Sequence, residues 1–139
     1  MKISIINGPN LNLIGTRETD IYGSESIEHY FQKLRKKYEH IDFDYFQSNI
    51  EGEIINEIQR AGLKMDGIIL NPGGYTHTSV AIGDAVAGIK VPVVEVHISN
   101  IDAREEFRKL SHVSAKCKGT ISGLGMKGYE LAVAFFLDS

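Results

Sequence analysis

The sequence predicts an α/β protein in which one parallel sheet of five strands lies between two layers of helices. Three observations lead to this prediction. Short apolar runs alternate with longer amphipathic runs along the whole chain. Four of the five short runs are largely apolar, as expected for parallel strands that helices cover on both faces. No repeat, low-complexity tract or linker divides the 139 residues, so we expect residues 1–139 to form a single domain.

The predicted strands follow the apolar runs and cover residues 2–6, 42–47, 67–70, 91–96 and 120–122. The second run alternates apolar with polar residues, a pattern typical of a strand at the edge of a sheet. Placing that strand at the edge predicts the order 2-1-3-4-5. Strands that alternate with helices also imply right-handed crossovers. The expected architecture is therefore a flavodoxin-like three-layer sandwich.

Helices are predicted between and after these strands. The first carries one apolar stripe at helical spacing, formed by Ile27, Tyr30, Phe31, Leu34 and Tyr38. Ser48 and Glu51 resemble a capping box that starts the second helix, and Gly62 is expected to end it. The remaining helices are predicted at about 78–88, 102–109 and 127–137.

Composition excludes several classes of function. The net charge is −3, and the basic cluster Arg35-Lys36-Lys37 lies on a predicted helix, which argues against a nucleic-acid partner. Cys117 is the single cysteine, so no internal disulfide or Cys/His metal motif is expected. The chain begins directly with a strand and has no apolar run of about 20 residues. These features predict a soluble cytoplasmic protein with no membrane partner and no metal.

Polar residues gather in the loops that follow three of the strands. Asn7 and Asn10 follow the first strand, Asn71 and His77 the third, and His97 the fourth. The carboxyl ends of parallel strands meet at one edge of such a sheet, which is where ligands bind. Asparagine beside glycine and proline is also ordinary turn chemistry. Convergence of three such loops on one edge favours a ligand site.

Glu95 and His97 are the most informative pair in the chain. Side chains alternate along a strand, so both are expected on the same face of the fourth strand. A carboxylate beside an imidazole fixes the tautomer of the ring and favours its protonated form. The pair can therefore supply a general acid or base. The alternative is a polar pair that only ends a strand.

Two further segments suggest anion binding and a lid. Backbone amides after the third strand and at Ile98 and Ser99 can hold a carboxylate, while phosphate-loop motifs are absent. The glycine-bracketed loop 15–23 carries Arg17 and Tyr22 and suits a lid. A tyrosine that acts as a base needs a pKa of about 7 rather than about 10, which is equivalent to about 4 kcal/mol. A guanidinium in a closed site can supply much of this, although a surface aromatic is the alternative.

These motifs resemble those of the type II 3-dehydroquinate dehydratases. The likeness spans nearly the whole chain at consistent spacing. It rests on residues 7–13 (NGPNLNL), 15–17 (GTR), 21–23 (IYG), 71–79 (NPGGYTHTS), 95–100 (EVHISN), 103–108 (AREEFR) and 128–132 (GYELA).

The resemblance implies a hydro-lyase of the shikimate pathway that converts 3-dehydroquinate to 3-dehydroshikimate by anti elimination through an enolate, without any cofactor. It implies that Tyr22 removes a C2 proton and that Arg17 holds it as tyrosinate. Asn10 would position a water at the developing enolate oxygen. His97, oriented by Glu95, would protonate the leaving hydroxyl.

The resemblance also implies the binding residues and the assembly. Asn71, His77 and Arg108 would hold ring hydroxyls, and the amides of Ile98 and Ser99 would receive the carboxylate. Asp84 would reach the site of a neighbouring subunit in a homododecamer, a tetramer of trimers.

Some alternatives stay open. Gly83, which directly precedes Asp84, stands where many members of this family carry arginine. A contact between subunits that this arginine would make is therefore in question. A biosynthetic and a catabolic role are not distinguished. The rival functions are a flavin- or phosphate-binding module, which would purify as a yellow protein if it held flavin, and a scaffold that has lost its chemistry.

Overall fold

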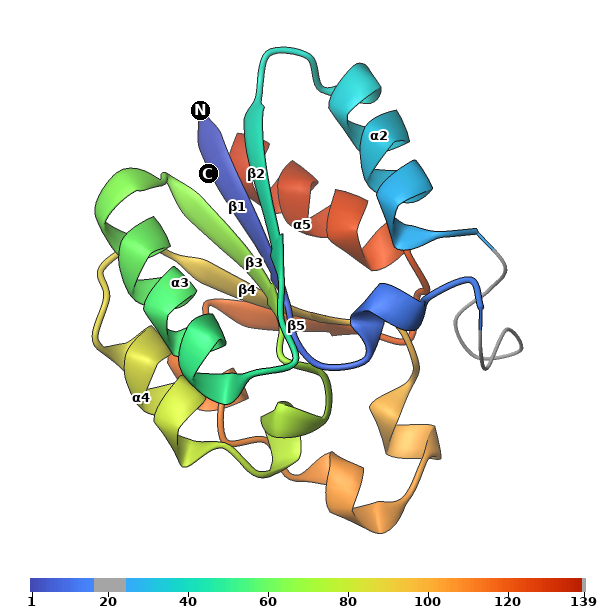
Figure 1. Cartoon of the computed structure of the whole chain (residues 1–139), viewed down its shortest axis with the longest axis vertical. Helices are drawn as coiled ribbons and strands as arrows, with labels where there is room; N and C mark the ends of the chain where they lie inside the picture. Colours follow the sequence, from blue (N-terminus) through green and yellow to red (C-terminus); the bar gives the residue numbers. More distant parts are fainter. Residues whose placement is uncertain (17–24, 139) are drawn as a thin grey trace.

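The computed structural model describes residues 1–16 and 25–138 (Figure 1). One parallel sheet has the order β2-β1-β3-β4-β5, which confirms the predicted order. The strands are β1 Lys2–Asn7, β2 Asp42–Gln47, β3 Gly67–Asn71, β4 Val93–His97 and β5 Gly119–Ser122. Three of them run one residue beyond the predicted end. As a result, Asn7, Asn71 and His97 are the last residues of their strands rather than loop residues.

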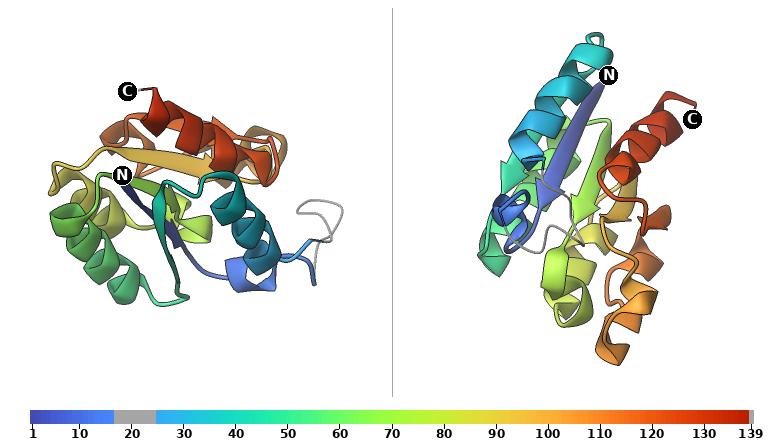
Figure 2. Two further views of the ribbon diagram at one scale, coloured as in Figure 1. Left: turned by 90° about the horizontal axis from the view of Figure 1, so that it is seen from above. Right: turned by 90° about the vertical axis from the view of Figure 1, so that its right-hand side faces the viewer.

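The described helices cover both faces of the sheet (Figure 2). They are α2 Ile27–Lys37, α3 Glu51–Lys64, α4 Val80–Ala87 and α5 Lys127–Leu137. Short 3-10 turns connect other elements: η1 Leu11–Leu13, η2 Gly73–His77, η3 Ile101–Ala103, η4 Glu106–Lys109 and η5 Ser114–Lys116. None of the helices within the described ranges is long and apolar enough to cross a membrane.

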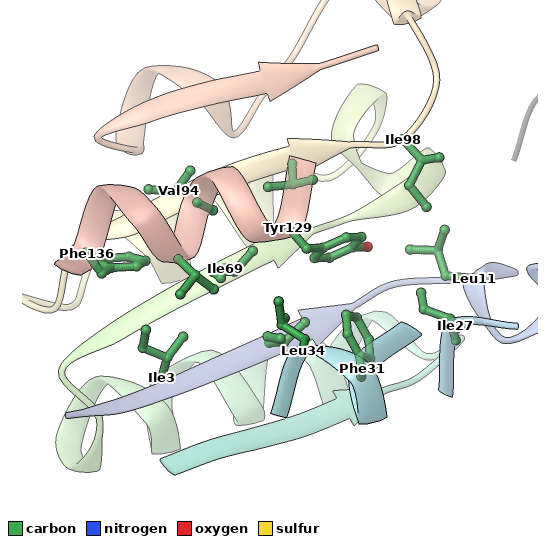
Figure 3. Close-up of a cluster of buried hydrophobic side chains, with 14 of the residues drawn as sticks. Ile3, Leu11, Ile27, Phe31, Leu34, Ile69, Val94, Ile98, Tyr129 and Phe136 are labelled. Carbon is green, nitrogen blue, oxygen red and sulfur yellow. The ribbon is translucent and has the colours of Figure 1, made fainter. Parts of the chain in front are cut away.

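The sheet separates two hydrophobic cores. Along β1, Ile3 and Ile5 join the core under α2 and α5, whereas Ile6 joins the core under α3 and α4. Figure 3 shows the first core, in which Phe31 of α2 packs against Tyr129 of α5 with ring centroids 5.2 Å apart. This arrangement is the predicted three-layer sandwich, since each strand sends alternate side chains to opposite faces.

The predicted limits of α3 are wrong at both ends. Ser48 Oγ accepts a hydrogen bond from the Ile50 amide (3.0 Å) and donates one to Glu53 (2.5 Å), so Glu53 rather than Glu51 is its partner. The helix continues through Gly62 to Lys64. A Cβ atom on Gly62 would lie 2.5 Å from Ile89 Cγ2. The glycine therefore permits close packing and does not end the helix.

The helix predicted at 102–109 is also wrong. The structure has two 3-10 turns, η3 and η4, because Arg104 between them has an extended backbone. Asn100 Oδ1 accepts the amide of Asp102 (3.2 Å), which closes the first turn locally. β4 is therefore followed by short turns, which lack the aligned peptide dipoles of a longer helix.

Gly83 allows α4 to approach the chain that follows η4. The residue is buried, and a Cβ atom there would lie 2.2 Å from the carbonyl oxygen of His112. The glycine thus has a packing role within one chain that the sequence did not reveal.

We expect Gly83→Ala to lower the free energy of unfolding by about 1–3 kcal/mol, because backbone atoms must move to accept the methyl group. Urea denaturation measures the change. Gly52→Ala is the matched control, since Gly52 also lies in a helix but has nothing within 4 Å of its Cβ position. That control should gain up to about 1 kcal/mol from helix propensity. Equal stability of the Gly83 variant and the parent would contradict the close approach.

Candidate active site

A cavity of about 180 Å³ opens at the carboxyl ends of the strands. Loops after β1, β3 and β4 converge on it, as the sequence predicted. Its lining includes seven of the residues singled out from the sequence: Asn10, Asn71, His77, His97, Ile98, Ser99 and Arg108. Pro9, Leu11, Leu13, Ile14, Gly73, Gly74, Ile101 and Arg104 complete it. The same edge carries η2, η3 and η4 (Figure 1).

Glu95 and His97 lie on the same face of β4, as period-two alternation predicted. His97 Nε2 is hydrogen-bonded to Glu95 Oε2. The Glu95 side chain is fully buried, and His97 is 4% exposed. A carboxylate accepts, so Nε2 of His97 carries the proton of this bond. Nδ1 is then the His97 ring nitrogen that is not bonded to Glu95.

His77 stands beside His97 with its ring nearly parallel. The centroids are 6.5 Å apart and the planes differ by 25°. His77 Nδ1 lies 2.8 Å from the carbonyl oxygen of Leu110 and must donate to it. Burial lowers the pKa of His77, and the charges of His97 and Arg108 act in the same direction. At neutral pH, His77 is therefore a neutral ring whose Nε2 can accept a hydrogen bond.

Asn71 is held by a buried network from α5. Its Nδ2 donates to the Tyr129 hydroxyl (3.0 Å), and its Oδ1 accepts the Gly73 amide (3.1 Å). Tyr129 in turn donates to Asn7 Oδ1 (2.8 Å). Burial raises the pKa of Tyr129, which keeps the phenol protonated and able to donate. The sequence contained Tyr129 in a matching motif but gave no sign that it orients a residue of the cavity.

The loops after β1 and β3 pack tightly against each other. The Gly8 amide donates to the Asn71 carbonyl (2.8 Å), and a Cβ atom on Gly8 would lie 2.4 Å from the Pro72 oxygen. Asn10 adopts a positive φ of 70°, and its amide donates to Asn49 Oδ1 (3.0 Å). Asn10 is thus positioned at the cavity by backbone contacts.

The segment after β4 is anchored by a glycine turn. The carbonyls of His97 and Ile98 accept the amides of Gly123 (3.2 Å) and Gly125 (3.0 Å). The Ser99 hydroxyl accepts a hydrogen bond from Arg104 Nη1 (3.4 Å). Arg104 lines the cavity although the sequence assigned it no role.

Arg108 occupies the rim of the cavity. Its Nε donates to Glu105 Oε1 (3.2 Å), and its guanidinium carbon lies 5.0 Å from the centroid of the Phe107 ring. These contacts hold the Arg108 guanidinium at the cavity that His77 and His97 also line. The site therefore combines the cations of Arg104 and Arg108, a buried Glu–His pair and a neutral histidine.

Four predicted residues are not among the described residues that line this cavity. Glu95 is fully buried and is bonded to the lining residue His97. Arg17 and Tyr22 lie outside the described residues. Asp84 is exposed on α4, in a separate groove against Ile55 and Gln59 of α3. Across residues 1–16 and 25–138, no cluster of three or more His, Cys, Asp or Glu side chains could hold a metal ion.

Comparison with known proteins identifies the family. A family model described as dehydroquinase class II matches residues 1–137. The chain belongs to this family. A 3-dehydroquinate dehydratase from Fusobacterium nucleatum is 54% identical, covering 99% of this chain and 97% of the relative. One from Caldicellulosiruptor bescii is 53% identical, covering 95% and 93%.

Solved class II dehydroquinase structures have the same fold. The type II dehydroquinase from Butyrivibrio crossotus is 47% identical and superposes with a TM-score of 0.95, covering 99% of this chain and 97% of that one. The enzyme from Propionibacterium acnes gives the same TM-score at 39% identity and the same coverage. Membership in the dehydroquinase class II family thus agrees with the resemblance seen in the sequence motifs.

Proposed function

We propose that this dehydroquinase family member dehydrates 3-dehydroquinate to 3-dehydroshikimate in the shikimate pathway. The observation that carries the proposal is the buried Glu95–His97 pair at the cavity. Dehydration of a β-hydroxy ketone needs a base for the acidic C–H and an acid for the departing hydroxyl. His97 is suited to the second role.

The proposed reaction is an anti elimination in two steps. Tyr22, held as tyrosinate by Arg17, takes the C2 proton, and the C2–H electron pair forms an enolate on the neighbouring ketone. A water held by Asn10 donates to the enolate oxygen. The enolate then re-forms the ketone, the C1–O bond breaks, and His97 gives its proton to the departing hydroxyl, which leaves as water. All atoms balance without a cofactor.

The described residues offer suitable partners for the substrate. The neutral His77 can accept a hydrogen bond from a ring hydroxyl at Nε2. Asn71 Nδ2 uses one hydrogen on Tyr129 and has a second for a ligand. Arg108 supplies a further donor, and we assign the amides of Ile98 and Ser99 to the substrate carboxylate.

We further propose that the enzyme works as a cytoplasmic homododecamer, a tetramer of trimers. Asp84 supports this proposal because it is exposed on α4, away from the cavity of its own chain. In an assembly it would act at a neighbour's site. Light scattering with size-exclusion chromatography measures the mass, and a monomer would contradict the proposal.

Turnover of 3-dehydroquinate is the direct test. Mixing the purified protein with this substrate should raise the ultraviolet absorbance of the conjugated enone in 3-dehydroshikimate. Borohydride should not inactivate the enzyme in the presence of substrate, because no lysine lines the cavity among the described residues and no imine is needed. Absence of turnover in the folded protein would refute the function, and borohydride inactivation would refute the enolate route.

A further inference from the structure

We propose that Ser114 is a positioning residue that holds the Glu95 carboxylate and, through it, the orientation of the His97 ring. This inference rests on the proposed function for its catalytic consequence, while its geometric content stands on the contacts alone. Ser114 begins η5 and does not itself line the cavity, and no role was assigned to it from the sequence motifs.

The Ser114 hydroxyl lies equally close to both oxygens of the Glu95 carboxylate. Its Oγ lies 3.0 Å from Glu95 Oε1 and 3.0 Å from Oε2. Glu95 accepts the His97 Nε2–H bond at Oε2. Glu95 is fully buried and shielded from bulk solvent, so the direction of its carboxylate depends on the protein donors around it. Ser114 and His97 are the donors from described side chains.

The chain around Ser114 is itself built to hold this hydroxyl in place. Ser111 Oγ accepts the amides of Val113 (3.1 Å) and Ser114 (2.9 Å). Val113 is fully buried in the core beneath α3 and α4. The His112 amide donates to the Thr76 carbonyl (2.9 Å). None of these contacts involves the Glu95 carboxylate. They therefore fix the backbone of Ser114 independently of its hydrogen bonds to Glu95.

The same segment serves both histidines of the site. Leu110, at its start, accepts the Nδ1–H of His77 (2.8 Å), whereas Ser114, at its end, directs Glu95 toward His97. The segment 110–114 therefore sets the free nitrogen of each ring: Nε2 for His77 and Nδ1 for His97. Orientation of a general acid by such a neighbour affects the reaction step more than the binding of substrate.

Three variants of Ser114 separate positioning from simple packing. We expect Ser114→Ala to lower kcat roughly 10-fold with KM within about 2-fold, since it removes a donor to a charged group. Ser114→Thr retains the hydroxyl and should restore most of kcat. Ser114→Cys has a slightly larger side chain and offers only a weak S–H donor, so its kcat should be intermediate.

Nuclear magnetic resonance of the histidine rings gives a readout that does not need turnover. The Nε2–H proton of His97 lies in the hydrogen bond to Glu95, so its chemical shift reports the length and direction of that bond. In Ser114→Ala the carboxylate loses a donor that fixes its rotation, so the chemical shift of this proton should change, and Ser114→Thr should restore it. The His97 signal is assigned by its loss in His97→Asn.

Ser48→Ala is the matched control, because Ser48 is also a serine that donates to a carboxylate, that of Glu53. Ser48→Ala should lower the free energy of unfolding by a comparable amount without changing the His97 Nε2–H chemical shift or kcat. An unchanged Nε2–H chemical shift in Ser114→Ala, or failure of Ser114→Thr to restore kcat, overturns the inference. Wild-type protein without turnover would instead refute the proposed function, and the change in the Nε2–H chemical shift would still decide the role of Ser114.

Discussion

The His97→Asn variant is expected to lose about 10²- to 10⁴-fold in kcat while it continues to exchange the C2 proton of 3-dehydroquinate with solvent. Asparagine can still form hydrogen bonds but cannot deliver a proton to a departing hydroxyl. In our scheme His97 acts only after the enolate has formed. Breaking the C1–O bond should therefore slow down, whereas proton removal by a separate base should continue.

The geometry of the pair leaves one ring nitrogen of His97 for the departing hydroxyl. His97 is buried, its Nε2 is committed to Glu95, and Nδ1 is the nitrogen available to a ligand. Mass spectrometry of substrate recovered from deuterium oxide measures the exchange, and ultraviolet absorbance measures product. His40→Asn is the control, since His40 is exposed near the start of β2. If exchange falls as much as product formation, the two steps do not use separate groups.

The Tyr22→Phe variant is expected to fold normally and to lose at least about 10³-fold in turnover, because it removes only the ionisable oxygen. The described tyrosines support Tyr22 as the base. Among the described residues, no tyrosine lines the cavity. Burial raises the pKa of Tyr30 to about 12, and it also raises the pKa of Tyr45 and Tyr129. These phenols stay protonated and are poor bases.

The Tyr22 test measures turnover and exchange together. Both should vanish in Tyr22→Phe, in contrast to His97→Asn, since no enolate forms without the base. Tyr38→Phe is the control. Tyr38 directly follows α2, donates to Glu130 of α5 (3.0 Å) and lies outside the cavity. Wild-type turnover in Tyr22→Phe would remove Tyr22 from its proposed role, and normal exchange without product would assign it to the second step.

Periodicity predicted much of the architecture. Alternation along residues 93–97 placed Glu95 and His97 on one face, and the half-polar run at 42–47 placed β2 at the edge of the sheet. Both predictions are confirmed, because the side-chain period of a strand is a property of the backbone itself. Local turn signals were less reliable. Gly62 was read as a helix end, although it lies within α3 and faces Ile89.

The sequence by itself determined the α/β class, the strand order and the set of side chains that gather at the carboxyl edge, since apolar periodicity and topology depend on residues close together along the chain. Only the tertiary structure decided how those side chains are oriented. Tyr129 reaches Asn71 from 58 residues away, and Ser114 reaches Glu95 across 19. Such contacts depend on how α5 and η5 pack against the sheet, and side-chain packing between distant segments leaves no regular spacing in the sequence.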